Sequence, residues 1–300
     1  LRPDLPVVCR TLEDGLVGSD ADGRLFRAAA DGKILWTVET ANSGNVNSVP
    51  VVLNGRVYFS GLKELVVIDP GSGAVLGRQK LDAASADAFG RRPAAVPGGV
   101  LFPANKALLV KHPDTGATLA AFPVGGGGSM MSPLVHGGRI YIADTMGVIR
   151  VLDAGTGRET AVLATSAVNP VAGAILISGG RGFLAGRRGD IAAFDPEKNA
   201  LLWQTRLEKD SSAAVYHDLL LADGVVYAFS KDRVYVLDAA AGTLSAETVR
   251  DAAAPPAEAG GSVYVPLSDG RVARLAKGSG RIGAAADIGG KPSKIGRAHV

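Results

Sequence analysis

The stretch Asn54-Gly55-Arg56-Val57-Tyr58-Phe59 contains the unit that decides the fold. Asn-Gly suits a two-residue hairpin turn, because both central residues of that turn need a positive φ. The β-branched and aromatic run after it is typical of a strand. Equivalent turn dipeptides recur at Asp14-Gly15, Gly98-Gly99, Gly137-Gly138, Gly179-Gly180, Asp223-Gly224 and Gly260-Gly261. Their second glycines lie 37 to 44 residues apart, a period that indicates a repeat architecture.

A second series of turns keeps nearly the same period. The run 65–68 ends at Asp69, and a glycine follows at Gly73. The glycine position is filled in turn by Gly32, Gly73, Gly116, Gly157, Asn199, Gly242 and Gly280. The first position holds Asp69, Asp153, Asp195 and Asp238, whereas His112 stands there in one repeat. We expect these aspartates to cap the tight turn with their side-chain oxygens, as in Asx-turns.

Four short strands per unit, with no amphipathic helix, describe one blade of a β-propeller. A single four-stranded sheet cannot bury both of its faces, but blades stacked around an axis can. The composition agrees, with 40 Gly, 47% hydrophobic residues and only 20% charged residues. We therefore predict an all-β propeller that forms one domain over residues 1–294 and shows seven repeats. Residues 295–300 break the rhythm, and we expect them to be a non-native tail.

The repeats resemble those of the pyrroloquinoline quinone (PQQ)-like propeller family. The best matches are residues 22–36 and 189–203, each of which ends in a tryptophan. In the family this tryptophan docks neighbouring blades, which implies such a role for Trp36 and Trp203 beside the blade aspartates. The equivalent places elsewhere hold Gly77, Ala120, Ala161, Ala246 and Ala284. Family propellers usually carry eight blades, so the resemblance implies eight blades in the complete protein.

The resemblance leaves three functions open, of which the BamB-type scaffold of outer-membrane protein assembly is closest in style. A PQQ-dependent dehydrogenase would need PQQ and calcium, and similar alcohol dehydrogenases add vicinal cysteines and a Glu/Asn/Asp calcium set. This chain has a single cysteine, Cys9, and we identify no such set. The third reading is a ligand-sensing domain of a larger signalling protein. We favour the non-catalytic scaffold, with no catalytic residue, no metal site and no cofactor.

A propeller scaffold is expected to bind protein partners through the loops that join its blades. The candidate contact residues are Asn169, Asp210 and Ser211. Nucleic acid is an improbable partner, because the net charge is only +3 and the basic residues are scattered. No apolar run reaches the length of a transmembrane helix. The chain opens on Leu1, so we expect any signal peptide to be absent or to have been removed. The resemblance implies a monomeric, periplasmic or otherwise extracytoplasmic protein, with a lipid anchor as an option.

Overall fold

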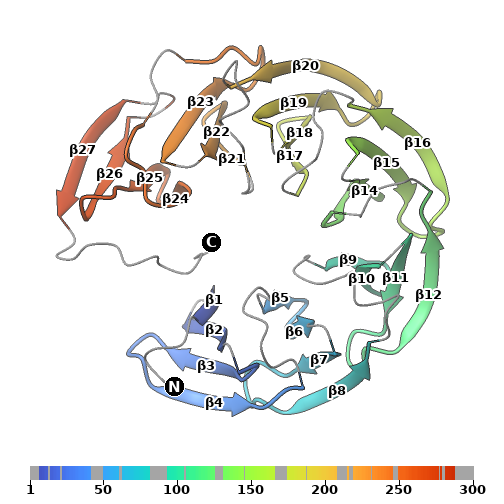
Figure 1. The fold of residues 1–300 in the computed structure, drawn as a ribbon. Helices are drawn as coiled ribbons and strands as arrows, with labels where there is room; N and C mark the ends of the chain where they lie inside the picture. The colour runs from blue at the N-terminus through green and yellow to red at the C-terminus, as the bar shows by residue number, and fades with distance from the viewer. Residues whose placement is uncertain are drawn as a thin grey trace.

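The computed structural model forms a ring of seven antiparallel β-sheets (Figure 1). It describes residues 7–12, 14–20, 22–41, 50–60, 63–81, 93–104, 106–125, 131–144, 146–165, 174–186, 188–207, 215, 219–230, 232–245, 249–276, 278 and 281–287, with the side chains of 7–11 excluded. This part of the chain contains strands and turns but no helix. The all-β propeller predicted from the repeats is therefore confirmed.

Each sheet is built from consecutive strands, which run outward from the centre of the ring in sequence order (Figure 1). The first three sheets contain β1 (Val7–Leu12), β2 (Gly15–Asp20), β3 (Leu25–Ala29) and β4 (Ile34–Val38); β5 (Val51–Leu53), β6 (Arg56–Ser60), β7 (Glu64–Ile68) and β8 (Val75–Lys80); and β9 (Ala94–Val96), β10 (Gly99–Ala104), β11 (Ala107–Lys111) and β12 (Thr118–Pro123). The fourth and fifth contain β13 (Leu134–His136), β14 (Arg139–Ala143), β15 (Val148–Asp153) and β16 (Glu159–Ala164); and β17 (Leu176–Ser178), β18 (Arg181–Ala185), β19 (Asp190–Asp195) and β20 (Ala200–Arg206). The last two contain β21 (Leu220–Ala222), β22 (Val225–Ser230) and β23 (Arg233–Asp238); and β24 (Ala257–Ala259), β25 (Ser262–Pro266), β26 (Arg271–Leu275) and β27 (Ile282–Asp287).

The sixth sheet departs from the predicted four strands. It has three named strands, and two isolated bridges, Val234↔Val249 and Leu237↔Leu244, continue the pairing beyond β23. Figure 1 also shows a wider sector between the seventh and first sheets than between other neighbours. The eight-blade expectation therefore stays a prediction.

Five of the seven predicted hairpin turns lie where the dipeptides placed them. Asn54-Gly55, for example, has φ values of 49° and 69°, and its flanking residues Leu53 and Arg56 pair. The other two predictions were wrong by one residue, because Gly15 pairs with Leu12 and Gly99 pairs with Val96, so both glycines lie in strands. A Cβ atom would lie 2.1 Å from the Ala28 carbonyl oxygen at Gly15, and 2.7 Å from Val110 Cγ1 at Gly99. Close approach explains both glycines, and Gly15 also has a positive φ of 152°.

The outermost hairpins share one irregularity. In every described sheet with four strands, the register between the third and fourth strands shifts close to the tight turn, as at Val67/Ile68 and Val110/Lys111. A β-bulge bends its strand and changes the direction of the side chains beyond it. The glycine after the turn has a positive φ, 74° at Gly73. These two features set where the fourth strand places its side chains against the next sheet.

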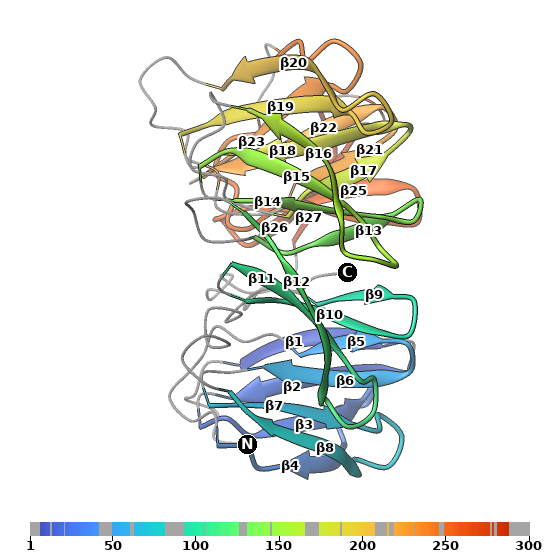
Figure 2. The same cartoon turned by 90° about the vertical axis from the view of Figure 1, so that its right-hand side faces the viewer.

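The hydrophobic core is divided among the contacts between successive sheets, which we call seams. Each of six buried clusters draws its members from two neighbouring sheets. The cluster between the first and second sheets, for instance, contains Val17, Trp36, Val57 and Val66. Both faces of the second to sixth sheets are thus covered by their neighbours, as the repeat architecture requires. Figure 2 shows the strands stacked edge-on, with the hairpins of the inner strands gathered at one end of the ring.

Candidate functional site

The two tryptophans singled out in the sequence lie at seams and reach the next sheet. Trp36 Nε1 donates a hydrogen bond to the Pro70 carbonyl at 2.8 Å, and Trp203 Nε1 donates to the Ala239 carbonyl at 3.2 Å. Both acceptors occupy the same repeat position, directly after the blade aspartates Asp69 and Asp238. The indole rings lie against the turn glycine of the next sheet, where a Cβ would approach to 2.6 Å at Gly73.

A different residue reaches the same carbonyl where no tryptophan is present. The Tyr58 hydroxyl donates to the Pro113 carbonyl at 2.8 Å, and the Tyr141 hydroxyl donates to the Pro196 carbonyl at 3.0 Å. These tyrosines come from the second strand of the blade, whereas the tryptophans come from the fourth. The seams after the first, second, fourth and fifth sheets therefore share one acceptor position, which an indole or a phenol hydroxyl reaches. Arginines add a second hydrogen bond to two of these carbonyls, Arg27 to Pro70 and Arg139 to Pro196. The sequence reasoning missed the tyrosines, although they recur three residues after the turn glycine.

The third sheet replaces the tryptophan with a residue that the repeat alignment also missed. Phe122 packs against Gly157 of the fourth sheet, where a Cβ would lie 2.1 Å from Phe122 Cγ. Phe122 stands two residues after Ala120, the aligned position, and so lies on the same face of the strand. The two-residue alternation of side chains along a strand is the signal that could have identified Phe122.

The blade aspartates bond within their own turns. Asp153 Oδ1 accepts hydrogen bonds from the Thr156 hydroxyl and amide, both at 2.8 Å, and Asp69 makes the same pair with Ser72. Asp195 and Asp238 accept two backbone amides each. These bonds stabilise the carboxylates, so the pKa of Asp153 is lowered, chiefly by the Thr156 hydroxyl. His112 takes the same place through Nδ1, which accepts from the Asp114 amide at 3.2 Å.

The predicted partner-binding residues Asn169, Asp210 and Ser211 lie outside the described residues. Within the described ranges, no cluster of three or more His, Cys, Asp or Glu residues could hold a metal ion. The described part of the chain also offers no helix able to span a bilayer.

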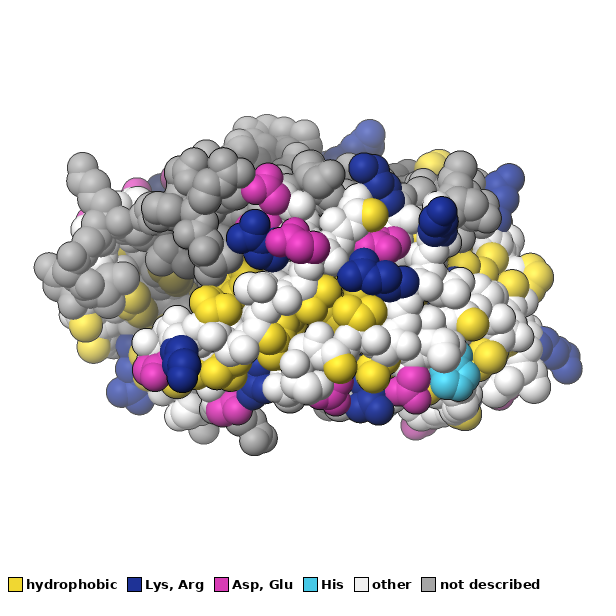
Figure 3. Space-filling view, turned by 90° about the horizontal axis from the view of Figure 1, so that it is seen from below, with side chains coloured by type: hydrophobic (Ala, Val, Ile, Leu, Met, Phe, Trp, Pro, Cys, Tyr) yellow, Lys and Arg dark blue, Asp and Glu magenta, His cyan; other side chains and the backbone are white. Residues whose placement is uncertain are grey.

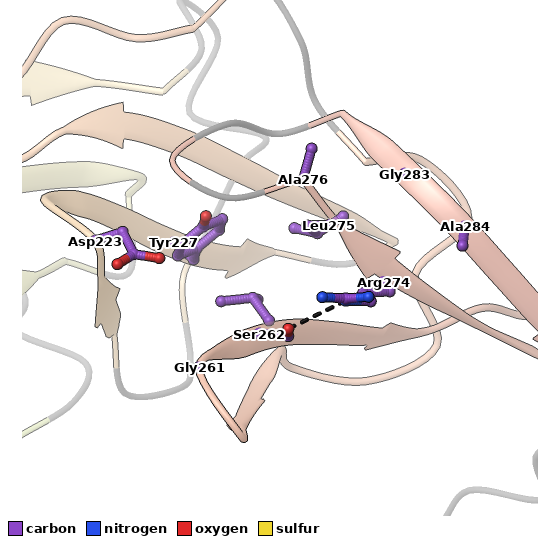
Figure 4. Close-up of a pocket in the computed structure, with 10 residues that line it drawn as sticks. Asp223, Tyr227, Gly261, Ser262, Arg274, Leu275, Ala276, Gly283 and Ala284 are labelled. Carbon is purple, nitrogen blue, oxygen red and sulfur yellow. Dashed lines mark hydrogen bonds between the residues drawn. The ribbon is translucent and has the colours of Figure 1, made fainter.

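A cavity of about 300 Å³ lies where the sixth and seventh sheets meet (Figure 4). The sixth sheet contributes Asp223 and Tyr227. The seventh contributes Ser262 and Arg274, and the small residues Gly283 and Ala284 leave space beside them. Arg274 Nε donates to Ser262 Oγ at 3.1 Å, a bond drawn in Figure 4.

The chemistry of this cavity suits polar contacts. Burial raises the pKa of the Tyr227 phenol, and the Asp223 carboxylate raises that pKa further. Tyr227 is therefore protonated at neutral pH. The lining thus combines a carboxylate, a guanidinium and a phenol, which can bind a polar group.

The outer surface below the first two sheets is mixed in character. Figure 3 shows hydrophobic side chains across the middle of this face, with basic and acidic side chains intermingled around them. Exposed apolar residues on the outer strands include Leu35 and Leu76. Ion pairs accompany them, with Arg24 Nε 2.8 Å from Glu39 Oε1 and Arg78 Nη1 2.7 Å from Glu64 Oε1. Such a face fits contact with protein better than contact with a phosphate backbone.

Comparisons with known proteins agree with the propeller. The sequence model of the family described as outer membrane protein assembly factor BamB matches residues 62–282. The crystal structure of BamB from Moraxella catarrhalis is similar with a TM-score of 0.74 and 18% identity, covering 97% of this chain and 87% of that one. The computationally designed Ika8 protein is similar with a TM-score of 0.73 and 18% identity, covering 93% and 86%. No curated protein sequence matches significantly. At such identities the structural likeness establishes the fold alone.

Proposed function

This chain belongs to the family of outer membrane protein assembly factor BamB, and we propose that it is a non-catalytic scaffold that binds proteins during outer-membrane protein assembly. The match of the family model to residues 62–282 carries the proposal, because it runs from before β7 into β27. The proposal places the protein in the periplasm or another extracytoplasmic compartment, as a monomer without a cofactor.

The described structure supports a scaffold in physical terms. Six buried clusters hold successive sheets together, so the hairpins and loops at the ends of the ring stand on a rigid frame. Loops on a rigid frame are where recognition usually lies, because little conformational entropy is lost on binding. The mixed outer surface of Figure 3 suits a protein partner as well.

Binding to the assembly machinery tests the proposal directly. The full-length protein would be immobilised and titrated with the purified outer-membrane protein assembly complex of the organism that encodes it. We expect saturable binding, and the absence of binding would overturn the proposal.

The alternative quinoprotein is tested with the same preparation. The protein would be incubated with PQQ and calcium, dialysed, and examined by absorbance and by a dye-linked screen of alcohols and sugars. We expect no retained quinone and no dye reduction. Retained quinone with turnover would replace the scaffold by a PQQ-dependent dehydrogenase.

A further inference from the structure

The outermost strand of the third sheet, β12, has an open edge that carries no charge. It is the last strand of its sheet and pairs only with β11. Residues 115–123 contain no Asp, Glu, Lys or Arg. Most of β12 is exposed, and Leu119 keeps 53% of its surface accessible. In Figure 2 the strand crosses the side of the ring that faces the viewer.

The other described outer strands carry the charges that usually protect such edges. Charges lie within β8 (Arg78, Lys80), β16 (Glu159), β20 (Arg206) and β27 (Asp287). In β4 the strand is uncharged but is flanked by Lys33 and Glu39, and Glu39 pairs with Arg24. Charged side chains on an exposed edge discourage the addition of a foreign strand, because pairing would bring them out of water. β12 is thus the outer strand in the described structure with no charged residue within it or directly beside it, although Pro123 leaves its last edge position without an amide donor.

The backbone of β12 presents groups that another strand can pair with. The Val124 amide donates inward to the Lys106 carbonyl at 2.9 Å. Hydrogen-bonding direction alternates along an antiparallel strand, so Phe122 and Ala120 also face β11 and Ala121 faces outward. The Ala121 amide and carbonyl, together with the Pro123 carbonyl, therefore form the open edge. Donors and acceptors at this spacing are matched by an extended peptide.

Packing against the fourth sheet holds β12 in an extended conformation. Phe122 lies against Gly157 of the fourth sheet, so the neighbouring Ala121 is fixed between anchored residues. A partner strand would find a preformed edge and would not have to order it, which lowers the entropic cost of binding. The exposed side chains beside that edge are small or apolar, chiefly Leu119 and Ala121. An uncharged partner segment fits them, because a charged one would lose hydration without gaining an ion pair.

We propose that β12 is a strand-addition site, at which an extended, uncharged segment of a partner protein adds to the third sheet beyond β12. This inference rests on the proposed scaffold function and gives that scaffold a defined surface and a class of partner segment. Backbone hydrogen bonds to Ala121 supply the affinity, and contacts beside Leu119 supply the selectivity.

The test uses a fluorescein-labelled synthetic peptide of alternating threonine and valine, about eight residues long to match a strand. Fluorescence anisotropy would measure its binding to the full-length protein. We expect saturable binding that Ala121→Pro weakens about tenfold or more, since proline removes the outward amide without touching the pairing to β11. The matched control is Val162→Pro, which changes the equivalent position of β16 and should leave the affinity unchanged.

A second variant and a second peptide protect the test from misfolding artefacts. Leu119→Lys keeps every backbone group of β12 but adds a charge to the edge, and it should also weaken binding. The same peptide with alternate amides N-methylated should not bind, because it cannot pair. Equal affinity for the wild type, Ala121→Pro and Leu119→Lys, or no peptide binding at all, would overturn the proposal.

The outcome can be separated from that of the proposed function. If the assembly complex binds wild-type protein and Ala121→Pro equally, the scaffold stands and the strand-addition site is wrong. If the peptide binds at β12 while the assembly complex does not bind, the site stands and the proposed role in assembly is wrong.

Discussion

Two neighbouring seams bind the equivalent turn carbonyl with different donors. They are the seam between the first and second sheets and the seam between the second and third. In the first, the indole of Trp36 comes from the fourth strand and donates to the Pro70 carbonyl. In the second, the hydroxyl of Tyr58 comes from the second strand and donates to Pro113, the equivalent carbonyl. The turn carbonyl therefore stays fixed while the donor moves between strands. A degenerate docking tryptophan need not mean a weak seam.

The largest expected effect is the loss of the indole. Trp36→Ala should lower the free energy of unfolding by about 3–5 kcal/mol, because it leaves a cavity and removes one of the two hydrogen bonds that the Pro70 carbonyl accepts, the other coming from Arg27 Nη1. Denaturant unfolding measures the change. Leu35→Ala on the same strand is the matched control, since Leu35 is 45% exposed, and it should cost less than about 1 kcal/mol. Equal losses in both variants would contradict a special role for the indole.

The sheets of the propeller were easier to predict from the sequence than the residues that fill the seams. The period of the turns predicted the sheets because φ > 0 and tight reversal restrict the residue types, as at Asn54-Gly55. The aromatic residues that dock the sheets were harder to predict, because any residue on the correct face of a strand can reach the seam. Phe122 fills it from two positions beyond Ala120, and Tyr58 fills it from another strand. An alignment of the repeats compares residues at the same position, whereas packing depends on the space that side chains fill.

Glycine substitutions sharpen the difference between the two seams. Gly73 and Gly116 both have a positive φ, so alanine at either should cost about 1–2 kcal/mol. At Gly73 the added Cβ would also lie 2.6 Å from Trp36 Cγ, whereas at Gly116 the nearest atom is Gln79 Cγ at 3.3 Å. Gly73→Ala should therefore lose about 1–3 kcal/mol more than Gly116→Ala in thermal or denaturant unfolding. Equal losses of stability in the two variants would show that the indole ring of Trp36 can move away from the added Cβ at no cost.

A smaller effect isolates the hydrogen bond at the tyrosine seam. Tyr58→Phe keeps the ring and removes the donor to Pro113, so the free energy of unfolding should fall by about 1 kcal/mol. Tyr264 is the control, because it holds the same repeat position in the seventh sheet but is only partly buried, and its hydroxyl has no hydrogen-bond partner among the described residues. Tyr264→Phe should leave stability unchanged. An equal fall in both variants would argue against the seam bond.

The smallest expected effect is the acid sensitivity of the turns that carry the acceptor. The pKa of Asp153 is lowered in the folded state, chiefly by the Thr156 hydroxyl, from the ordinary aspartate value of about 3.9. Its stabilising contribution is present above that value and is lost as pH falls through the folded pKa. Asp153→Asn should flatten the fall of the melting temperature below about pH 4. Parallel curves for the variant and the wild type would refute this account.

The division of the core among six seams has a consequence for how damage spreads. Each cluster couples a sheet only to its neighbours in the ring, so the molecule behaves as a chain of nearest-neighbour contacts. Losses at separate seams, such as Trp36→Ala combined with Trp203→Ala, should add, whereas two losses at one seam should not. Hydrogen exchange should then open blade by blade, and a weakened seam should release its two sheets while distant sheets stay protected.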